Sequence, residues 1–145
     1  MQGVFESRSA GETYELGRRL GLTAAPGSVF ALCGDLGAGK TVFAQGFAAG
    51  LGVKQPVNSP TFTILQVYDS GRLPLCHMEA YRLEDEEELE AIGGTEYLYG
   101  DGVCLIEWAG IVRGLLPADT QFVEIERVPE EGPEYRRVTL CQEET

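Results

Sequence analysis

A glycine-rich loop at residues 34–41 constrains this chain more than any other segment. Its sequence, Gly-Asp-Leu-Gly-Ala-Gly-Lys-Thr, matches the pattern G-x-x-x-x-G-K-[ST]. Glycine tolerates positive φ and has no Cβ, so the backbone N–H groups of such a loop can turn inward around an anion. Lys40 adds a positive charge for the β- and γ-phosphates, and the Thr41 hydroxyl is placed to bind Mg²⁺. The loop predicts a binding site for a nucleotide polyphosphate.

The residues on either side of the loop support this interpretation. Residues 28–33 form a short apolar run that is rich in strand-forming side chains. Phe43, Phe47 and Leu51 recur every four residues after the loop, which predicts an amphipathic helix. A strand, a glycine loop and a helix therefore follow one another in the order that phosphate binding requires. The positive end of the helix dipole would face the phosphates.

The length and composition predict an ordered globular protein. The chain has 145 residues, of which 43% are hydrophobic, and this suits one domain with a single core. There is no run of about 18 apolar residues and no signal-peptide pattern, so we expect a soluble, cytoplasmic protein that does not enter a membrane. The four cysteines form no C-x-x-C pair, and we expect buried free thiols rather than a metal site or disulfides.

The charge of the chain is strongly negative. There are 23 Asp and Glu residues against 11 Lys and Arg residues, which gives a net charge of −12. Nucleic-acid affinity comes mostly from clustered Lys and Arg side chains that release counterions from the phosphate backbone. We therefore do not expect direct, stable nucleic-acid binding. The densest acidic run, residues 84–90, is typical of a solvated helix face, with a partner-docking surface as the alternative.

The segments outside the loop complete an α/β pattern. Ser9 and Glu12 have the spacing of a capping box, which predicts a helix through about residue 20. Residues 61–68 and 73–78 have the pattern of two strands joined by a turn. We further predict a helix over 86–92, a strand buried on both faces over 103–106, and closing strands over 122–127 and 135–140. The expected fold is α/β, with a mainly parallel central sheet flanked by helices, plus antiparallel hairpin strands.

Two carboxylates follow predicted strands. Glu107 comes directly after residues 103–106, and Glu79 comes directly after the strand that ends near Met78. Ligands of open α/β sheets collect outside the carboxyl ends of the strands. A carboxylate there can hold Mg²⁺ or orient the water that attacks the γ-phosphate. The alternative is that each is an ordinary exposed acid at the end of a strand.

Two other polar features have more than one interpretation. The segment Asn-Ser-Pro-Thr at 58–61 lies between the loop helix and the next strand, and it fits a nucleotide-sensing switch loop that would use Thr61, or a plain turn. His77 is the only histidine and lies in an apolar strand. In that position a hydrogen-bonded structural role is commoner than catalysis.

Four blocks of the chain, taken in order, resemble the TsaE family, also called YjeE, the bacterial ATPases of tRNA threonylcarbamoyladenosine biosynthesis. They are the loop at 34–41, Ser-Pro-Thr-Phe-Thr at 59–63, His-Met-Glu-Ala-Tyr-Arg at 77–82 and Ile-Glu-Trp at 106–108. The resemblance implies a single-domain P-loop NTPase over residues 1–145 that binds and hydrolyses Mg·ATP. It also implies TsaD and TsaB as partner proteins, with ATP hydrolysis supporting repeated turnover and with tRNA contacted only through the partners.

The same resemblance implies roles for single residues. The nucleotide would be bound by the loop and by one residue beside the site, namely Gly34, Asp35, Leu36, Gly37, Ala38, Gly39, Lys40, Thr41 and Trp108. Mg²⁺ would be held by Thr41, Glu79 and Glu107. The residues expected to serve hydrolysis are Lys40, Thr61, Glu79 and Glu107. Lys40 is expected to face solvent when no nucleotide is bound.

Glu79 departs from the family pattern, and the end of the chain is not covered by the resemblance. The family has Asp where this chain has Glu79, so the charge is kept but the carboxylate lies one methylene farther out, a difference of about 1 Å that matters in phosphoryl transfer. Beyond residue 110 the resemblance marks no residue, and Arg136 and Arg137 are the candidates for an adenine or arginine contact. No convincing arginine finger is found, so we expect slow ATP hydrolysis without partners.

Three alternatives share the loop. A small-molecule P-loop kinase would also need an arginine-bearing lid and an acceptor pocket, for which 145 residues leave little space. A GTP-dependent switch protein would carry Asn-Lys-x-Asp, which this sequence lacks, so ATP is favoured over GTP. A nucleotide-binding adaptor without hydrolysis is the third.

Overall fold

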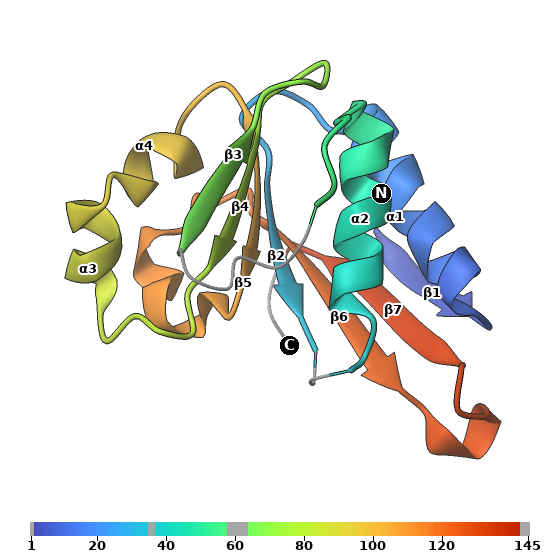
Figure 1. The fold of residues 1–145 in the computed structure, drawn as a ribbon. Helices are drawn as coiled ribbons and strands as arrows, with labels where there is room; N and C mark the ends of the chain where they lie inside the picture. Colours follow the sequence, from blue (N-terminus) through green and yellow to red (C-terminus); the bar gives the residue numbers. More distant parts are fainter. Residues whose placement is uncertain (1, 35–36, 58–63, 143–145) are drawn as a thin grey trace.

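Seven strands form one mixed β-sheet in the part of the chain that the structure describes, which is residues 2–34, 37–57 and 64–142 of a computed structural model. The strands are β1 (Gly3–Ser7), β2 (Val29–Cys33), β3 (Leu65–Tyr68), β4 (Leu75–Glu79), β5 (Val103–Glu107), β6 (Gln121–Arg127) and β7 (Arg136–Cys141). Their order across the sheet is β1-β7-β6-β2-β5-β4-β3 (Figure 1). The central strands β6, β2, β5 and β4 are parallel, whereas β1, β7 and β3 pair with their neighbours in antiparallel fashion. This confirms the expected parallel centre with antiparallel hairpin strands.

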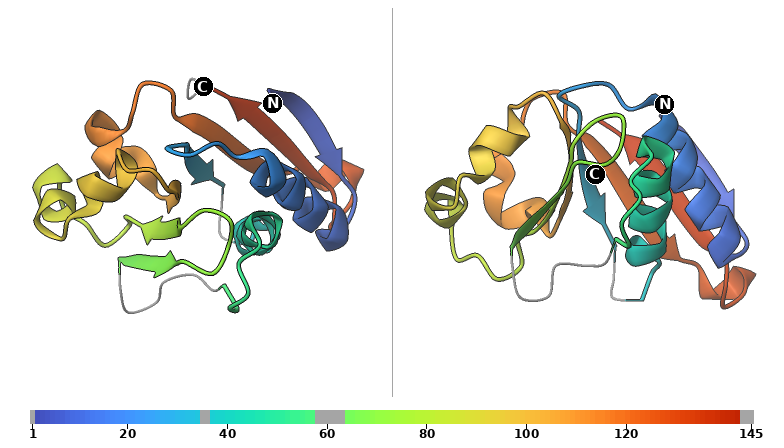
Figure 2. Two further views of the ribbon diagram at one scale, coloured as in Figure 1. Left: turned by 90° about the horizontal axis from the view of Figure 1, so that it is seen from above. Right: turned by 45° about the horizontal axis from the view of Figure 1, so that its top comes forward.

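Helices cover both faces of the sheet. They are α1 (Ala10–Thr23), α2 (Lys40–Leu51), α3 (Glu86–Ala91) and α4 (Gly94–Leu98), together with the 3-10 segments η1 (Ala109–Leu115) and η2 (Pro129–Glu131). α1 and α2 lie side by side on one face, and α3, α4 and η1 lie on the other (Figure 2). The acidic run lies on and before α3, which exposes most of its charged side chains, as expected of a solvated helix face.

The two helix layers explain why β2 and the first four residues of β5 are apolar. Along β2, Phe30 and Leu32 pack with α1 and α2, whereas Val29 and Ala31 pack with α3, α4 and η1. Side chains of a strand alternate between the two faces, so a strand covered on both faces must be apolar at every position. All five residues of β5 are buried, as predicted for residues 103–106, and the last of them is Glu107.

α1 and α2 approach each other closely because both helices carry glycine at their contact. A Cβ on Gly17 or Gly21 of α1 would lie 2.3 or 2.1 Å from a carbonyl oxygen of α2. A Cβ on Gly46 of α2 would lie 2.0 Å from the Tyr14 carbonyl oxygen of α1. No methyl group fits at these distances, so the closeness of this helix pair depends on the missing side chains. The pair in turn fixes the position of α2, which begins at the phosphate-binding loop.

Gly46→Ala is expected to lower the free energy of unfolding by about 1–3 kcal/mol, because the added methyl group must push the two helices apart. Urea denaturation followed by circular dichroism measures the change. Gly11→Ala in α1 is the matched control, since its Cβ would meet only Ser9 Oγ at 3.7 Å. Alanine favours a helix more than glycine, so the control should be neutral or slightly stabilising. Equal stability of the two variants would contradict the close-packing argument.

Several elements differ from the expectations. β1 and α4 were not predicted, because β1 is a short edge strand with little alternation and α4 begins at Gly94, where two glycines were expected only to end a helix. The expected strand over 61–68 is confirmed as β3 from Leu65 to Tyr68, while residues 61–63 lie outside the described segments. The predicted strands over 122–127 and 135–140 correspond to β6 and β7.

The cysteines agree with the expectation of free thiols. All four are free, with Cys76 and Cys104 buried and Cys33 and Cys141 partly buried. Cys76 and Cys104 face each other across β4 and β5, and the hydrogen bond between the thiols, together with burial, raises the pKa of Cys76. Among the described residues there is no group of three or more His, Cys, Asp or Glu side chains that could hold a metal ion. None of the helices in these segments is long and apolar enough to span a membrane.

Candidate active site

The glycine loop connects β2 to α2 as the sequence predicts. Gly34, Gly37 and Gly39 all have positive φ, at 151°, 79° and 109°. Gly34 also passes so close to β6 that a Cβ would lie 2.6 Å from the Ile125 carbonyl oxygen. Gly39 is the N-cap of α2 and has no side chain with which to cap that helix end. The first turn of α2 therefore offers N–H donors and a positive dipole end to an anion.

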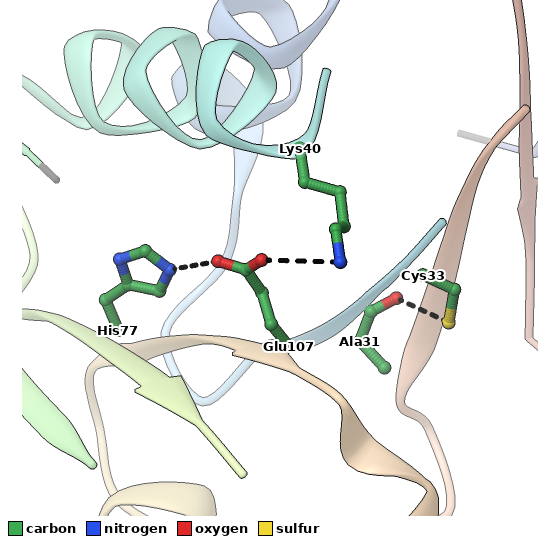
Figure 3. Close-up of polar contacts among 5 residues, drawn as sticks. All are labelled: Ala31, Cys33, Lys40, His77 and Glu107. Atoms are coloured by element: carbon green, nitrogen blue, oxygen red, sulfur yellow. Dashed lines mark hydrogen bonds and ion pairs between the residues drawn. The ribbon is translucent and has the colours of Figure 1, made fainter. Parts of the chain in front are cut away.

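Lys40, the first residue of α2, is buried. It is 9% exposed, and its Nζ lies 3.9 Å from Glu107 Oε1 (Figure 3). The same Nζ lies 4.4 Å from the centre of the Trp108 ring. The expectation that Lys40 faces solvent is therefore wrong. The physical reason is that Glu107 and the face of Trp108 offer the ammonium group both a charge and a cation–π contact in the nucleotide-free protein. The side chain lies beside the loop, where a polyphosphate would compete with Glu107 for it.

Glu107 ends β5 and is also buried, at 4% exposed. Its Oε2 lies 2.9 Å from His77 Nε2 of the adjacent strand β4, and both side chains lie on the same face of the sheet (Figure 3). A carboxylate only accepts hydrogen bonds, so Nε2 carries the proton in this contact. Among the described residues His77 Nδ1 has no hydrogen-bond partner. The histidine and the lysine thus hold Glu107 from two sides, which excludes the alternative of an ordinary exposed acid.

Glu79 ends β4 directly opposite Glu107 in the strand register. Burial and the negative charge of Glu107 raise the pKa of Glu79, while His77, Lys40 and Arg82 act in the opposite direction. The negative charge of Glu107 opposes ionisation of the neighbouring Glu79 carboxyl, so a cation beside the two side chains would be favoured. The donor set is suited to Mg²⁺, which prefers oxygen ligands and usually combines one or two carboxylates with substrate phosphates and water. Glu79, Glu107 and the Thr41 hydroxyl are the residues placed to hold such an ion.

Trp108 follows Glu107 in a left-handed backbone conformation, with φ 59° and ψ 43°. It is the only non-glycine residue with positive φ among the described residues. Such a conformation costs about 1–3 kcal/mol and is found most often at functional sites. The turn places the indole ring over Lys40 and about 6.3 Å from the Tyr81 ring, while leaving the side chain 45% exposed. An aromatic surface is therefore presented at the mouth of the site.

Two cavities meet at Lys40 and Trp108, which line both of them. One has a volume of about 430 Å³ and contains Thr41, Glu79 and Glu107, together with loop glycines. The other, of about 350 Å³, lies between the ends of β2, β6 and β7, and its walls are mostly apolar. The first cavity is suited to phosphates and a metal ion. The second offers apolar surface of the kind that binds a nucleoside.

Arg136 occupies a position that the sequence did not predict. It was a candidate for an adenine or arginine contact, but its Nε donates to the Ala38 carbonyl oxygen of the phosphate-binding loop at 2.7 Å. Arg137 is exposed and faces Glu6 and Glu126 in the registers of β7 with β1 and β6. The sequence did not show which of the two neighbouring arginines faces the loop, because that depends only on the pleat of β7.

The remaining expected site residues are placed as follows. Gly34, Gly37, Ala38, Gly39, Lys40 and Thr41 form the loop and the start of α2. Asp35, Leu36 and Thr61 lie outside the described segments, as does the rest of the expected switch loop at 58–61. The structure therefore brings together the loop, Glu79, Glu107 and Trp108, and it adds His77 and Arg136.

A family model and two curated relatives point to the same family. A family model described as "Threonylcarbamoyl adenosine biosynthesis protein TsaE" matches residues 7–138. The tRNA threonylcarbamoyladenosine biosynthesis protein TsaE of Bacillus subtilis is 48% identical over 129 residues, which cover 89% of this chain and 78% of that protein. The protein of the same name from Treponema pallidum is 47% identical over 135 residues, which cover 93% of this chain and 97% of that protein. The crystal structure of Bacillus subtilis YdiB superposes with a TM-score of 0.80 at 38% identity, covering 97% of this chain and 84% of that one.

Proposed function

The chain belongs to the TsaE family, and from that membership and the site geometry we propose that it is a Mg-dependent ATPase of tRNA threonylcarbamoyladenosine biosynthesis. The observation that carries the proposal is the contact of Lys40 with Glu107 at the end of the glycine loop. A buried lysine whose charge is matched by one carboxylate is poised to exchange that carboxylate for the more highly charged β- and γ-phosphates.

The proposed mechanism assigns tasks to the residues around the phosphates. The N–H groups at the start of α2 and the Lys40 ammonium bind the polyphosphate and stabilise the charge that develops during hydrolysis. Bound Mg²⁺ would supply further neutralisation of the phosphate charge, held by Thr41, Glu79 and Glu107. Glu107, once released by Lys40, remains held by His77, and its freed oxygen is placed to orient the attacking water. Trp108 covers Lys40 and limits the access of bulk water.

The alternatives are less well supported. A small-molecule kinase needs a second pocket for a phosphoryl acceptor beside the phosphate site, and the second cavity that adjoins Lys40 is of a size suited to the nucleoside itself. A guanine-specific switch protein would carry Asn-Lys-x-Asp, and this sequence lacks that motif. An adaptor that does not hydrolyse nucleotide would not need a buried carboxylate beside the loop, such as Glu107 bonded to His77.

We further propose that TsaD and TsaB act as partners that complete the site. An arginine finger supplied by a partner is worth about 10³–10⁵ in rate for nucleotide hydrolysis. Arg136, which lies beside the described part of the loop, is engaged with backbone carbonyls. The net charge of −12 disfavours direct tRNA binding, so tRNA would be held by the partners.

Phosphate release from ATP and from GTP, measured with the chain alone and with TsaD and TsaB, tests this function. We expect slow hydrolysis of ATP by the chain alone, strong stimulation by the two partners together, and little activity with GTP. Filter binding of tRNA at physiological salt should detect no complex with the chain alone. Fast hydrolysis without partners, or tight tRNA binding by the chain, would contradict the proposal.

Glu79→Asp is expected to retain a substantial part of the partner-stimulated ATPase activity. Aspartate keeps the charge opposite Glu107, and it is the residue expected at this position in the TsaE family. Glu79→Gln removes the charge and is expected to lower the activity much further, with a raised requirement for Mg²⁺. Both variants are compared with the wild type by steady-state hydrolysis over a Mg²⁺ titration. If aspartate is as inactive as glutamine, the site requires the longer side chain rather than the charge alone.

A further inference from the structure

The hairpin of β6 and β7 reaches the phosphate-binding loop through the side chain of Arg136. Nε donates to the Ala38 carbonyl oxygen at 2.7 Å, and Nη2 makes a longer contact of 3.5 Å with the Gly37 carbonyl oxygen. Nη1 donates to the carbonyl oxygens of Pro133 and Tyr135, at 2.8 Å each. The guanidinium thus joins two loop carbonyls to two carbonyls of its own hairpin.

The acceptors of the Arg136 guanidinium in these contacts are all backbone carbonyl oxygens. The protein carries 23 acidic residues, yet within the described segments no ion pair joins Arg136 to a carboxylate. Arginine presents its N–H groups in a rigid planar fork, which holds several acceptors in a fixed geometry. The side chain is half-buried and points from the same face of β7 as the core residues Val138 and Leu140, toward the loop. Its contacts are therefore built into the fold rather than made by a free surface side chain.

Peptide planarity shows what these contacts do. In a trans peptide the C=O of one residue and the N–H of the next point in opposite directions. Holding the Ala38 carbonyl on Arg136 turns the Gly39 N–H away from the hairpin, and holding the Gly37 carbonyl does the same for the Ala38 N–H. The glycines of this loop have few steric restraints of their own, so an outside contact is needed to keep one orientation.

We propose that Arg136 is a positioning residue that clamps residues 37–39 of the phosphate-binding loop, with the carbonyls of Gly37 and Ala38 toward β7 and the N–H groups of Ala38 and Gly39 toward the phosphates. The inference rests on the proposed nucleotide function for its purpose, but the clamp itself is a property of the nucleotide-free chain. Arg136 does not touch the reacting atoms in this role. It acts through the backbone of Gly37, Ala38 and Gly39.

The first test measures the loop without nucleotide. ¹⁵N relaxation gives order parameters for the Ala38 and Gly39 amides in the wild type, Arg136→Ala, Arg136→Lys and Arg137→Ala. We expect order parameters of about 0.85 in the wild type and below about 0.6 in Arg136→Ala, the ranges of rigid and flexible backbone. Arg137→Ala is the matched control, because its exposed side chain lies on the opposite face of β7. Unchanged order parameters in Arg136→Ala would overturn the clamp, whether or not the protein binds nucleotide.

The second test measures phosphate binding. Trp108 is the only tryptophan and lies over Lys40, so its fluorescence reports on ligands at the loop. Because Arg136 contributes charged hydrogen bonds, we expect Arg136→Ala to weaken Mg·ADP and Mg·pyrophosphate by at least about ten-fold. Arg136→Lys should recover part of the loss, and Arg137→Ala should lie within about two-fold of the wild type, a factor worth only about 0.4 kcal/mol. Melting curves without ligand confirm that each variant is folded at the titration temperature.

The two tests separate the inference from the function on which it rests. A loop that becomes mobile in Arg136→Ala with unchanged affinity for both ligands would overturn the positioning role. A wild-type protein that binds neither ligand would contradict the proposed function, while the order parameters would still decide whether the clamp exists. Weaker binding of both ligands by a mobile loop supports the inference in full.

Discussion

Lys40→Ala is expected to remove most of the binding of Mg·ATP and to lower partner-stimulated hydrolysis by about 10²–10³, the effect of deleting one donor to a developing negative charge. Lys40 is the ammonium group nearest the loop, and it lies against a cavity shared with Thr41, Glu79 and Glu107. No other lysine can replace it, because Lys54 is the only other one in the chain. Calorimetric titration with Mg·ATP and steady-state phosphate release measure the two losses.

Lys54→Ala is the matched control, since it removes the same group from an exposed position after α2. Its ATP affinity and hydrolysis rate should equal those of the wild type. Removing a solvent-facing Lys40, as expected from the sequence, would cost little stability. The buried contact with Glu107 instead predicts a lower melting temperature for Lys40→Ala than for Lys54→Ala. Full ATP affinity and full hydrolysis in Lys40→Ala would show that the loop is not the phosphate site.

Glu107→Gln is expected to lower the hydrolysis rate by about 10²–10⁴, the range that a positioned proton acceptor contributes, while leaving nucleotide binding largely intact. Glutamine has nearly the same shape and can still accept a hydrogen bond from His77, so the architecture around β4 and β5 is kept. The loss of charge removes the competitor of the phosphates for Lys40. Affinity for ADP without metal should therefore be equal to or greater than that of the wild type.

Single-turnover hydrolysis with TsaD and TsaB, and Trp108 fluorescence titration with ADP, separate the two effects. Glu90→Gln, on the exposed side of α3, is the control for the loss of one negative charge. It should change neither measurement. A Glu107→Gln protein with normal turnover would remove Glu107 from the mechanism, and one with no nucleotide binding would assign it to binding rather than to hydrolysis.

The sequence alone determined the order of most of the helices and strands and identified the glycine loop that connects β2 to α2. The loop at 34–41 has a chemistry that depends on residue types at fixed local spacing, and its strand and helix follow from short-range patterns. The runs of β2 and β5 show that both faces of these strands are covered, because no other environment accepts apolar residues at every position. Glu79 and Glu107 could be placed at one edge of the sheet, since the carboxyl ends of neighbouring parallel strands coincide.

Only the tertiary structure decided which side chains hold one another. Lys40 is buried against Glu107 and Trp108, His77 binds a carboxylate 30 positions away in the chain, and Arg136 reaches a loop carbonyl across 98 positions. These contacts depend on strand order, register and pleat, and a shift of one residue in β7 would point Arg137 at the loop instead. Local patterns carry no record of register between distant strands, because register is set by the packing of the whole sheet against its two layers of helices.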